Sequence, residues 1–387
     1  MLALQRHATE TAGPSFRGGT VRCIHIPVLL LLACVCMAQG IIIPHPVKIR
    51  ITAVYGFGDS TIDSGWFKTE ISPGVYTGDA GYDALLAMAL LEGAGKPTTN
   101  PGPVSIEVLA AFFRLTAKPA NQSGTNYAVS GARTQGSNSD DPKLFPNAIP
   151  TVIQIANFLK AHHGAADPHA IYVVSSGNND VAHAIDVPSD SHCPSNPIDC
   201  VRTAAHDLAA AITRLHAAGA AAIIVPNLFE SFGSDPKPAY RQAFDSTLKA
   251  ALAAAHVDVI VADMNGLRKA IVAGHGAFGI RLKATGTSSK ACSQPTGIGS
   301  GWAMLCSPQS PVSTINPSDA ALKFLFADDG HFTTGGQEIV GDYFYCLLTK
   351  RLARANGTIG NPPWVLDFPR SPSPPNCAKA SNLPFHL

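Results

Sequence analysis

Four short polar segments carry the residue types that acyl transfer requires, and each follows a short apolar stretch. They are Gly58-Asp59-Ser60, Ser130-Gly131, Gly177-Asn178-Asn179-Asp180 and Asp328-Asp329-Gly330-His331. Open α/β sheets place their chemistry on loops beyond the carboxyl ends of the strands. We therefore expect the four segments to meet at one edge of a sheet.

Each of the chemical roles in acyl transfer has one candidate residue. Ser60 is the expected nucleophile, but a serine is inert unless a base removes its proton and donors hold the oxyanion. His331 is the expected base, and Asp328, three residues earlier, can hold the imidazole ring in the right tautomer. The expected oxyanion donors are the backbone N–H groups of Ser60 and Gly131 and the side-chain amide of Asn179.

Each candidate also has a simpler interpretation. Ser60 alone is typical of a turn or helix cap, His331 of a surface residue beside a helix, and Asn179 of a turn. Asp329 competes with Asp328 for the histidine, although the spacing favours Asp328 and we expect Asp329 to be solvated. We expect hydrogen-bonding scaffold roles for Asp59, Asp63 and Asp180. We expect surface positions for five other histidines: His162, His163, His183, His192 and His275.

Several other classes of protein do not fit the sequence. Gly56-Phe57-Gly58 hints at a dinucleotide loop, but Thr61 occupies the place of the third glycine. The Gly-x-Ser-x-Gly elbow of α/β-hydrolases does not occur. The formal net charge is +1 with no basic cluster, so nothing favours nucleic acid. No Cys-x-x-Cys or His-x-x-x-His spacing indicates zinc, and we expect no metal ligands.

Strand-like and helix-like segments alternate along the chain. We expect strands at 51–57, 126–129, 170–175, 220–226 and 257–262, and helices at 82–91, 104–115, 150–163, 203–218, 238–255, 266–273 and 333–354. Such alternation predicts a parallel sheet with helices on both faces. Two long excursions, 66–103 and 280–320, are the expected walls of a binding pocket.

The start of the chain is typical of an exported protein. Residues 27–38 form a short apolar run, preceded by Arg22 and ended by Ala38, so residues 1–38 are predicted to be a signal peptide. The leader is long, and Val21 is an alternative start. The sequence ending at Cys34 also admits a lipoprotein anchor. We expect a secreted or periplasmic protein with a domain at 39–356 and a proline-rich strap at 357–387.

Six of the 9 cysteines follow residue 38, and an even count in an exported chain suggests disulfides. Six cysteines allow 15 pairings. We choose nearest neighbours: Cys193–Cys200, Cys292–Cys306 and Cys346–Cys377. Free buried thiols are the alternative.

The chain resembles the SGNH hydrolases, also called GDSL esterases and lipases, over most of residues 51–350. Phe57 to Gly65 resembles the first block of the family, with Thr61 where leucine is usual, and residues 126–133 resemble the second. Gly177-Asn178-Asn179-Asp180 fits the third block. Asp328 and His331 fit the fifth, with Phe332 where proline is common. The layout is most similar to the bacterial lecithinase, haemolysin and acyltransferase branch, although the arginine expected near residues 102–107 is missing.

The resemblance implies a three-layer, flavodoxin-like α/β/α sandwich that needs no cofactor. It implies a serine ester hydrolase, with acyl transfer to alcohols as a further activity. The partners we expect are an ester substrate, transient contact with a lipid surface and no second subunit. The alternative is a non-catalytic surface or carbohydrate-binding protein on the same scaffold. Intact Ser60, Asp328 and His331 favour the enzyme. Phospholipid, triacylglycerol, sugar acetate and aryl ester remain equally open as substrates.

Overall fold

The computed structural model is described here for residues 50–68, 80–135, 148–186, 196–228, 238–274, 290–298, 301–309, 315, 321, 324–355 and 377. Residues from His45 onward form one compact unit. The predicted signal peptide, Cys193 and most of the proline-rich strap lie outside the described residues. No helix of the described segments is long and apolar enough to cross a membrane.

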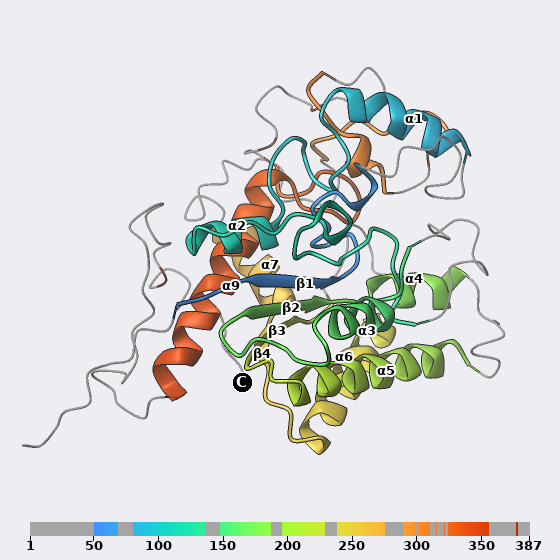
Figure 1. The fold of residues 1–387 in the computed structure, drawn as a ribbon. Helices are drawn as coiled ribbons and strands as arrows, with labels where there is room; N and C mark the ends of the chain where they lie inside the picture. The colour runs from blue at the N-terminus through green and yellow to red at the C-terminus, as the bar shows by residue number, and fades with distance from the viewer. Residues whose placement is uncertain are drawn as a thin grey trace, which may run out of the picture. The chain divides into compact units, whose positions relative to one another are not determined.

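Four strands form one parallel sheet in the order β1-β2-β3-β4 (Figure 1). Their bounds are β1 Val54–Gly58, β2 Ile171–Ser175, β3 Ala222–Pro226 and β4 Ile260–Ala262. The main helices are α1 Ala80–Leu91, α2 Ser105–Phe112, α3 Thr151–Ala161, α4 Asn178–Asp186, α5 Pro197–Ala217, α6 Pro238–Ala254, α7 Met264–Gly274 and α9 Thr334–Ala355. Short 3-10 helices are η1 Trp66–Lys68, η2 Ala120–Gln122 and η5 Trp302–Leu305.

The strand predicted at 126–129 is present only as an extended segment beside β1. It makes an isolated parallel bridge between Gly56 and Asn126. The Tyr127 N–H donates to the Gly56 carbonyl at 2.8 Å and the Val129 N–H to the Gly58 carbonyl at 3.0 Å. If the segment 126–129 is counted as the second strand along the chain, the strands lie in the order 2-1-3-4-5 across the sheet. This order is flavodoxin-like, as the family resemblance implied.

Helices cover both faces of the sheet, which confirms the predicted three-layer architecture. Helices α2, α7 and α9 pack on one face, and α3, α4, α5 and α6 pack on the other (Figure 1). Alternate residues of β2 point to opposite faces, because Ile171 and Val173 belong to the first core and Tyr172 and Val174 to the second. Burial on both faces explains why the strands read as continuous apolar runs.

The start of α5 differs from the prediction, which had residues 186–200 as a loop and a helix from 203. The helix begins at Pro197, because the Asn196 side chain caps it by accepting from the Ile198 N–H at 3.1 Å. Proline at the first helical position fits the helix without losing a hydrogen bond.

The two long excursions pack against each other beyond the carboxyl ends of the strands. They form a third apolar core that includes Phe67 of η1, Leu86 of α1, and Trp302 and Leu305 of η5. Val129 and Ala327 also belong to this core, so it adjoins the segments that carry Gly131 and Asp328.

Two of the predicted disulfides are confirmed. Cys292 is bonded to Cys306 and Cys346 to Cys377, with Cα–Cα separations of 5.8 and 5.4 Å. The first joins two parts of the 280–320 excursion, and the second ties Cys377 to α9. The third predicted pair includes Cys193, which lies outside the described residues.

Candidate active site

Ser60 lies in the tight turn that follows β1. Gly58 ends the strand with φ of +144°, and a Cβ there would come within 1.8 Å of the Ser175 carbonyl oxygen, so only glycine fits. The next residue, Asp59, donates its backbone N–H to the same carbonyl at 3.1 Å. The Asp59 carboxylate accepts from the Thr61 N–H at 2.9 Å and hydroxyl at 2.7 Å. These bonds fix the turn on both sides of Ser60.

The structure brings Ser60, His331 and Asp328 into one hydrogen-bonded chain, although 271 residues separate the first two. Ser60 Oγ lies 2.7 Å from His331 Nε2. His331 Nδ1 lies 2.8 and 2.9 Å from the two carboxylate oxygens of Asp328. Because Nδ1 donates to a carboxylate, Nε2 carries the lone pair and can accept the serine proton.

Asp328 is buried, with only 1% of its side chain exposed, but it is well supplied with donors. Its carboxylate accepts from the backbone N–H groups of Ala303, Gly330 and His331 at 2.8 to 2.9 Å. Burial raises the pKa of Asp328, but the His331 charge and these bonds outweigh it, so the pKa lies below its ordinary value. The carboxylate is therefore ionised at neutral pH and can stabilise an imidazolium.

The environment of His331 favours its protonated form. Burial lowers the pKa of His331, but the charge and hydrogen bond of Asp328 outweigh it, so the pKa lies above its ordinary value. The charges of Asp59 and Asp63 act in the same direction. Burial raises the pKa of Asp59 itself to about 6, despite its two bonds from Thr61.

Asn179 and Gly131 lie in segments that contact each other. Asn179 stands in the first turn of α4 and donates its side-chain amide to the Ala132 carbonyl at 2.8 Å. Gly131 has φ of +82°, a conformation that favours glycine. The second block is therefore tied directly to the third, while the oxyanion role of both residues remains a prediction.

Three buried carboxylates hold the loops of the site together, as expected of scaffolds. Asp63 accepts from the backbone and the hydroxyl of Ser130 at 2.8 and 2.6 Å, which fixes the segment before Gly131. Asp180 accepts from the backbone and hydroxyl of Thr134. Asp59 supports the Ser60 turn as described above. Asp329 forms an ion pair with Lys290, and its side chain is 45% exposed.

Sequence reasoning missed two contributors to the site because they lie far away in the chain. Gln154 of α3 accepts from the Gly58 N–H at 2.7 Å and donates to the Gly58 carbonyl at 2.9 Å, 96 residues away. Ala303 of η5 donates to Asp328. Neither residue has a sequence signal of its own. The expectation of a surface position for His183 is wrong, because this residue of α4 is buried and only 4% exposed.

One small cavity adjoins the Ser60 turn within the described part of the chain. A cavity of about 20 Å³ lies beside the turn and is lined by Thr61, Ser175, Asn178 and Phe332 among others. This volume holds about one water molecule, so an acyl chain does not fit there. Among the described residues, no group of three His, Cys, Asp or Glu side chains is arranged to hold a metal ion.

Comparison with known proteins identifies the family. The sequence pattern of the GDSL-like Lipase/Acylhydrolase family matches residues 54–344, which is most of the chain. The protein therefore belongs to the GDSL-like lipase/acylhydrolase family, as the sequence blocks predicted.

Individual relatives are distant. The chain is 26% identical over 343 residues to an uncharacterized protein from the trpE-trpG intergenic region of Pseudomonas putida, covering 83% of this chain and 51% of that protein. It thus spans about half the length of this relative. Among solved structures, a candidate GDSL-like lipase from Parabacteroides merdae is 11% identical with a TM-score of 0.37, covering 79% of this chain and 99% of that one. A catalytic mutant of an acetylxylan esterase from Geobacillus stearothermophilus is 12% identical with a TM-score of 0.35, covering 77% and 96%.

Proposed function

We propose that this protein is a serine hydrolase of carboxylic esters that works through an acyl-serine intermediate. The observation that carries the proposal is the chain of hydrogen bonds from Asp328 through His331 to Ser60, with Ser60 Oγ 2.7 Å from His331 Nε2. Family membership supports ester hydrolysis in general. The roles of the individual residues follow from chemistry.

In the first half of the reaction, Ser60 Oγ attacks the ester carbonyl carbon while its proton moves to His331 Nε2. Asp328 stabilises the resulting imidazolium without taking a proton itself. The negative charge that develops on the carbonyl oxygen is held by the N–H groups of Ser60 and Gly131 and the Asn179 amide. The intermediate then collapses, the alcohol leaves with the proton from Nε2, and the acyl group stays on Ser60.

In the second half, His331 removes a proton from water, which attacks the acyl-serine carbonyl. Collapse of this intermediate releases the carboxylic acid and returns the proton to Ser60 Oγ. An alcohol in place of water gives a new ester, so acyl transfer is the same chemistry with another acceptor.

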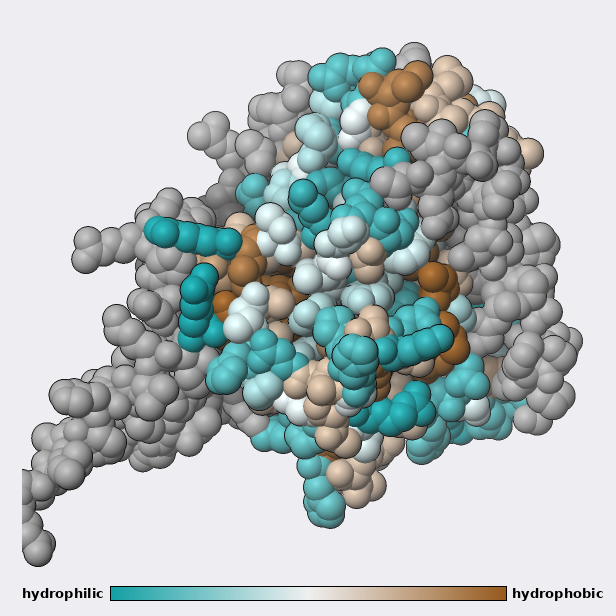
Figure 2. All heavy atoms as spheres, viewed as in Figure 1, coloured by the Kyte–Doolittle hydropathy of each residue, from teal (hydrophilic) through white to brown (hydrophobic). Residues whose placement is uncertain are grey.

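Contact with a lipid surface is a further part of the proposal. The outer face of α1 carries Leu91 and Met88, which are 87% and 48% exposed, and its one charged side chain, Asp83, is buried. Figure 2 shows a largely hydrophilic and neutral face with small apolar patches, one of them at the top, where α1 lies in Figure 1. Transient rather than permanent contact is expected of so small a patch, and we expect the protein to be monomeric.

Export to an oxidising compartment is supported by the two disulfides, since such bonds persist outside the cytosol. We propose cleavage after Ala38, with a lipid-anchored Cys34 as the alternative. The mass of the mature chain after export in a bacterial host distinguishes the two.

Hydrolysis of p-nitrophenyl esters of increasing acyl length tests the function. We expect the wild-type protein to release p-nitrophenol from at least the short esters, and His331→Ala to lose that activity while remaining folded. A wild-type protein that hydrolyses none of them, but binds sugars or lipids, would indicate the non-catalytic alternative.

A further inference from the structure

The Asp328 carboxylate depends on one donor from a distant part of the chain. Gly330 and His331 donate their backbone N–H groups to Oδ1 from within the same turn. The N–H of Ala303 reaches Oδ2 at 2.8 Å from η5, which lies 25 residues earlier. Oδ2 is also 2.9 Å from His331 Nδ1, so the Ala303 donor acts on an oxygen that faces the imidazole.

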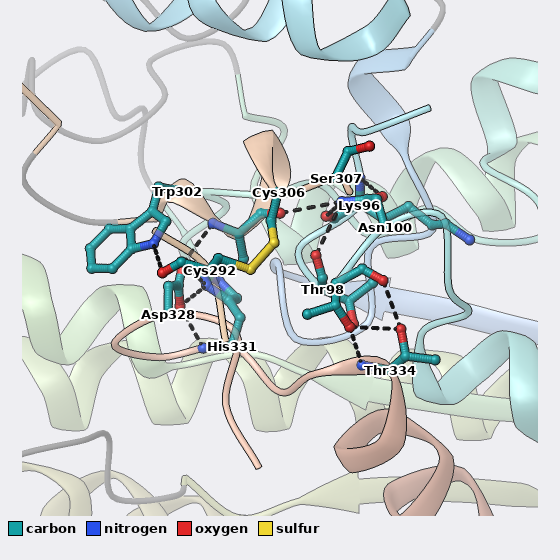
Figure 3. The surroundings of a disulfide bond; sticks show 12 residues. Lys96, Thr98, Asn100, Cys292, Trp302, Cys306, Ser307, Asp328, His331 and Thr334 are labelled. Carbon is teal, nitrogen blue, oxygen red and sulfur yellow. Dashed lines mark hydrogen bonds and ion pairs between the residues drawn. A yellow bond between two sulfur atoms is a disulfide. The ribbon is translucent and has the colours of Figure 1, made fainter. Parts of the chain in front are cut away.

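A disulfide fixes the position of η5 next to Asp328. Cys306 follows η5 directly and is bonded to Cys292, at a sequence separation of 14 (Figure 3). Within the loop so closed, Trp302 donates its indole N–H to the Cys292 carbonyl at 3.3 Å. Cys292 in turn donates its backbone N–H to the carbonyl of Ala327, the residue before Asp328, at 3.0 Å. The disulfide therefore connects the donor segment to the turn that carries the acid.

The other side of the loop is anchored to the first excursion. Gly95 donates its N–H to the Met304 carbonyl at 2.7 Å, and Asn100 donates its N–H to the Cys306 carbonyl at 3.0 Å. The Asn100 side chain also reaches the Ala303 carbonyl at 3.3 Å. Ala303, Trp302 and Cys306 are all fully buried, so no water competes for these bonds.

We propose that the loop closed by Cys292 and Cys306 positions Asp328 for catalysis through the N–H of Ala303. This inference rests on the proposed roles of Ser60, His331 and Asp328. Cys292, Ala303 and Cys306 act as positioning residues, since they hold the acid and are not themselves the reacting groups. Without the disulfide, η5 keeps its local hydrogen bonds but loses the covalent limit on where the Ala303 N–H points.

The expected consequence is a loss of turnover together with a shift in the pH profile. Misplacing a catalytic group by about 1 Å can lower the rate about 10²-fold. A carboxylate that is displaced, or that has lost a donor, also supports the imidazolium less well, so His331 loses its proton at lower pH. The acidic limb of the kcat/KM profile therefore moves to lower pH while the plateau falls.

The other ionisable groups around the pair are the same residues in every variant compared below. Asp59 and Asp63 face His331 from the Ser60 turn, and Tyr82 of α1 lies near Asp328 with a pKa raised by burial, so it stays neutral. Asp329 is paired with Lys290, whose ammonium also lies 4.7 Å from the centre of the Trp302 ring. A change in the acidic limb thus reports on Asp328.

The test compares two double variants with one ester. Cys292→Ala/Cys306→Ala opens the loop beside Asp328. Cys346→Ala/Cys377→Ala is the matched control, because it removes the disulfide that ties Cys377 to α9, away from the proposed triad. We expect kcat of the first variant to fall about tenfold or more, and the acidic limb of its kcat/KM profile to move to lower pH. We expect the control variant to keep the wild-type kcat and the wild-type pH profile. Thermal unfolding, measured on both, separates loss of stability from loss of function.

Ala303→Pro provides an independent variant, since it removes the N–H and leaves the disulfide intact. We expect it to share the lower kcat and the shifted limb. If the first double variant does not fold, the same kinetics on wild-type protein reduced in its folded state, with the open disulfide identified by mass spectrometry, replace it. If the folded protein without the Cys292–Cys306 bond keeps the wild-type kcat and the wild-type acidic limb of its pH profile, the proposal is overturned. Failure of the wild-type protein to hydrolyse any ester would instead overturn the proposed function.

Discussion

The residues around Ser60 show burial and charge acting in opposite directions on the same groups. Burial favours the neutral form of both His331 and Asp328, but their mutual contact outweighs it and favours the ion pair. Asp59 has no cationic contact of that kind, and burial raises its pKa to about 6. Two groups with raised pKa values, Asp59 and His331, therefore adjoin the serine.

The pH profile of kcat/KM is expected to follow His331. The histidine must be neutral to act as base, so activity is lost as pH falls through its pKa, which lies above the ordinary value of about 6.5. Rates measured from about pH 5 to about pH 9 check this. Asp59→Asn removes one charge that supports the imidazolium, so its acidic limb should move to lower pH. A profile flat between about pH 5 and pH 8, with chemistry limiting, would count against a histidine base.

Asn179 and Asn178 are neighbours with different expected roles. Asn179→Ala should lower kcat by about 10²–10³ with little change in KM, because the oxyanion exists fully only in the transition state. Asn178 accepts from Arg241 at 2.8 Å, so Asn178→Ala should affect stability more than turnover. Equal losses in kcat for both variants, or an effect of Asn179→Ala on KM alone, would return Asn179 to a purely structural role. Gly131→Ala is a less direct probe, since φ of +82° also adds backbone strain.

At the scale of elements, α3 supports the end of β1 through one side chain. Gln154 is 1% exposed and satisfies both the N–H and the carbonyl of Gly58, two residues before Ser60.

Replacing Gln154 by leucine should therefore destabilise the fold and the site together. The buried Gly58 N–H would lose its partner, at about 1–3 kcal/mol, while the Gly58 carbonyl would keep the bond from the Val129 N–H. Chemical denaturation and ester hydrolysis measure the two effects. Ile153→Ala, one residue away and 47% exposed, is the control and should change stability by at most about 0.5 kcal/mol. A Gln154→Leu protein as stable and active as the control would contradict this role.

Much of this arrangement could be predicted from sequence because its signals are local. Apolar runs ending in Gly58, Ser175 and Pro226 indicate parallel strands, and strand ends in such sheets meet at one edge. The same reasoning predicted that Ser60 and His331 meet, and they do, although the apolar run 324–327 before Asp328 forms only an isolated bridge and not a strand. The contacts of Gln154 with Gly58 and of Ala303 with Asp328 could not be predicted, since ordinary side chains and backbone groups make them across 96 and 25 residues. The burial of His183 could not be predicted, because a single polar residue in a helix gives no hydrophobic periodicity that would show which way it faces.

At the scale of the whole molecule, the sheet with its helices carries the proposed catalytic groups, and the two long excursions complete their surroundings. The third apolar core joins η1, α1 and η5, and η5 reaches the acid. The sheet and its helices form the scaffold, while the two excursions are the parts in which substrate preference can vary. An acyl-length series on wild-type protein addresses that preference.

The central claim is that Ser60 carries the acyl group during turnover. The most direct measurement is peptide mass spectrometry of protein quenched in acid during hydrolysis of a p-nitrophenyl ester, with Ser60→Ala treated in parallel. We predict the mass of the acyl group on the peptide containing Ser60, its absence in Ser60→Ala, and a fall in turnover of about 10⁶ in that variant. An adduct on another residue, or near-normal turnover by folded Ser60→Ala, would contradict the account.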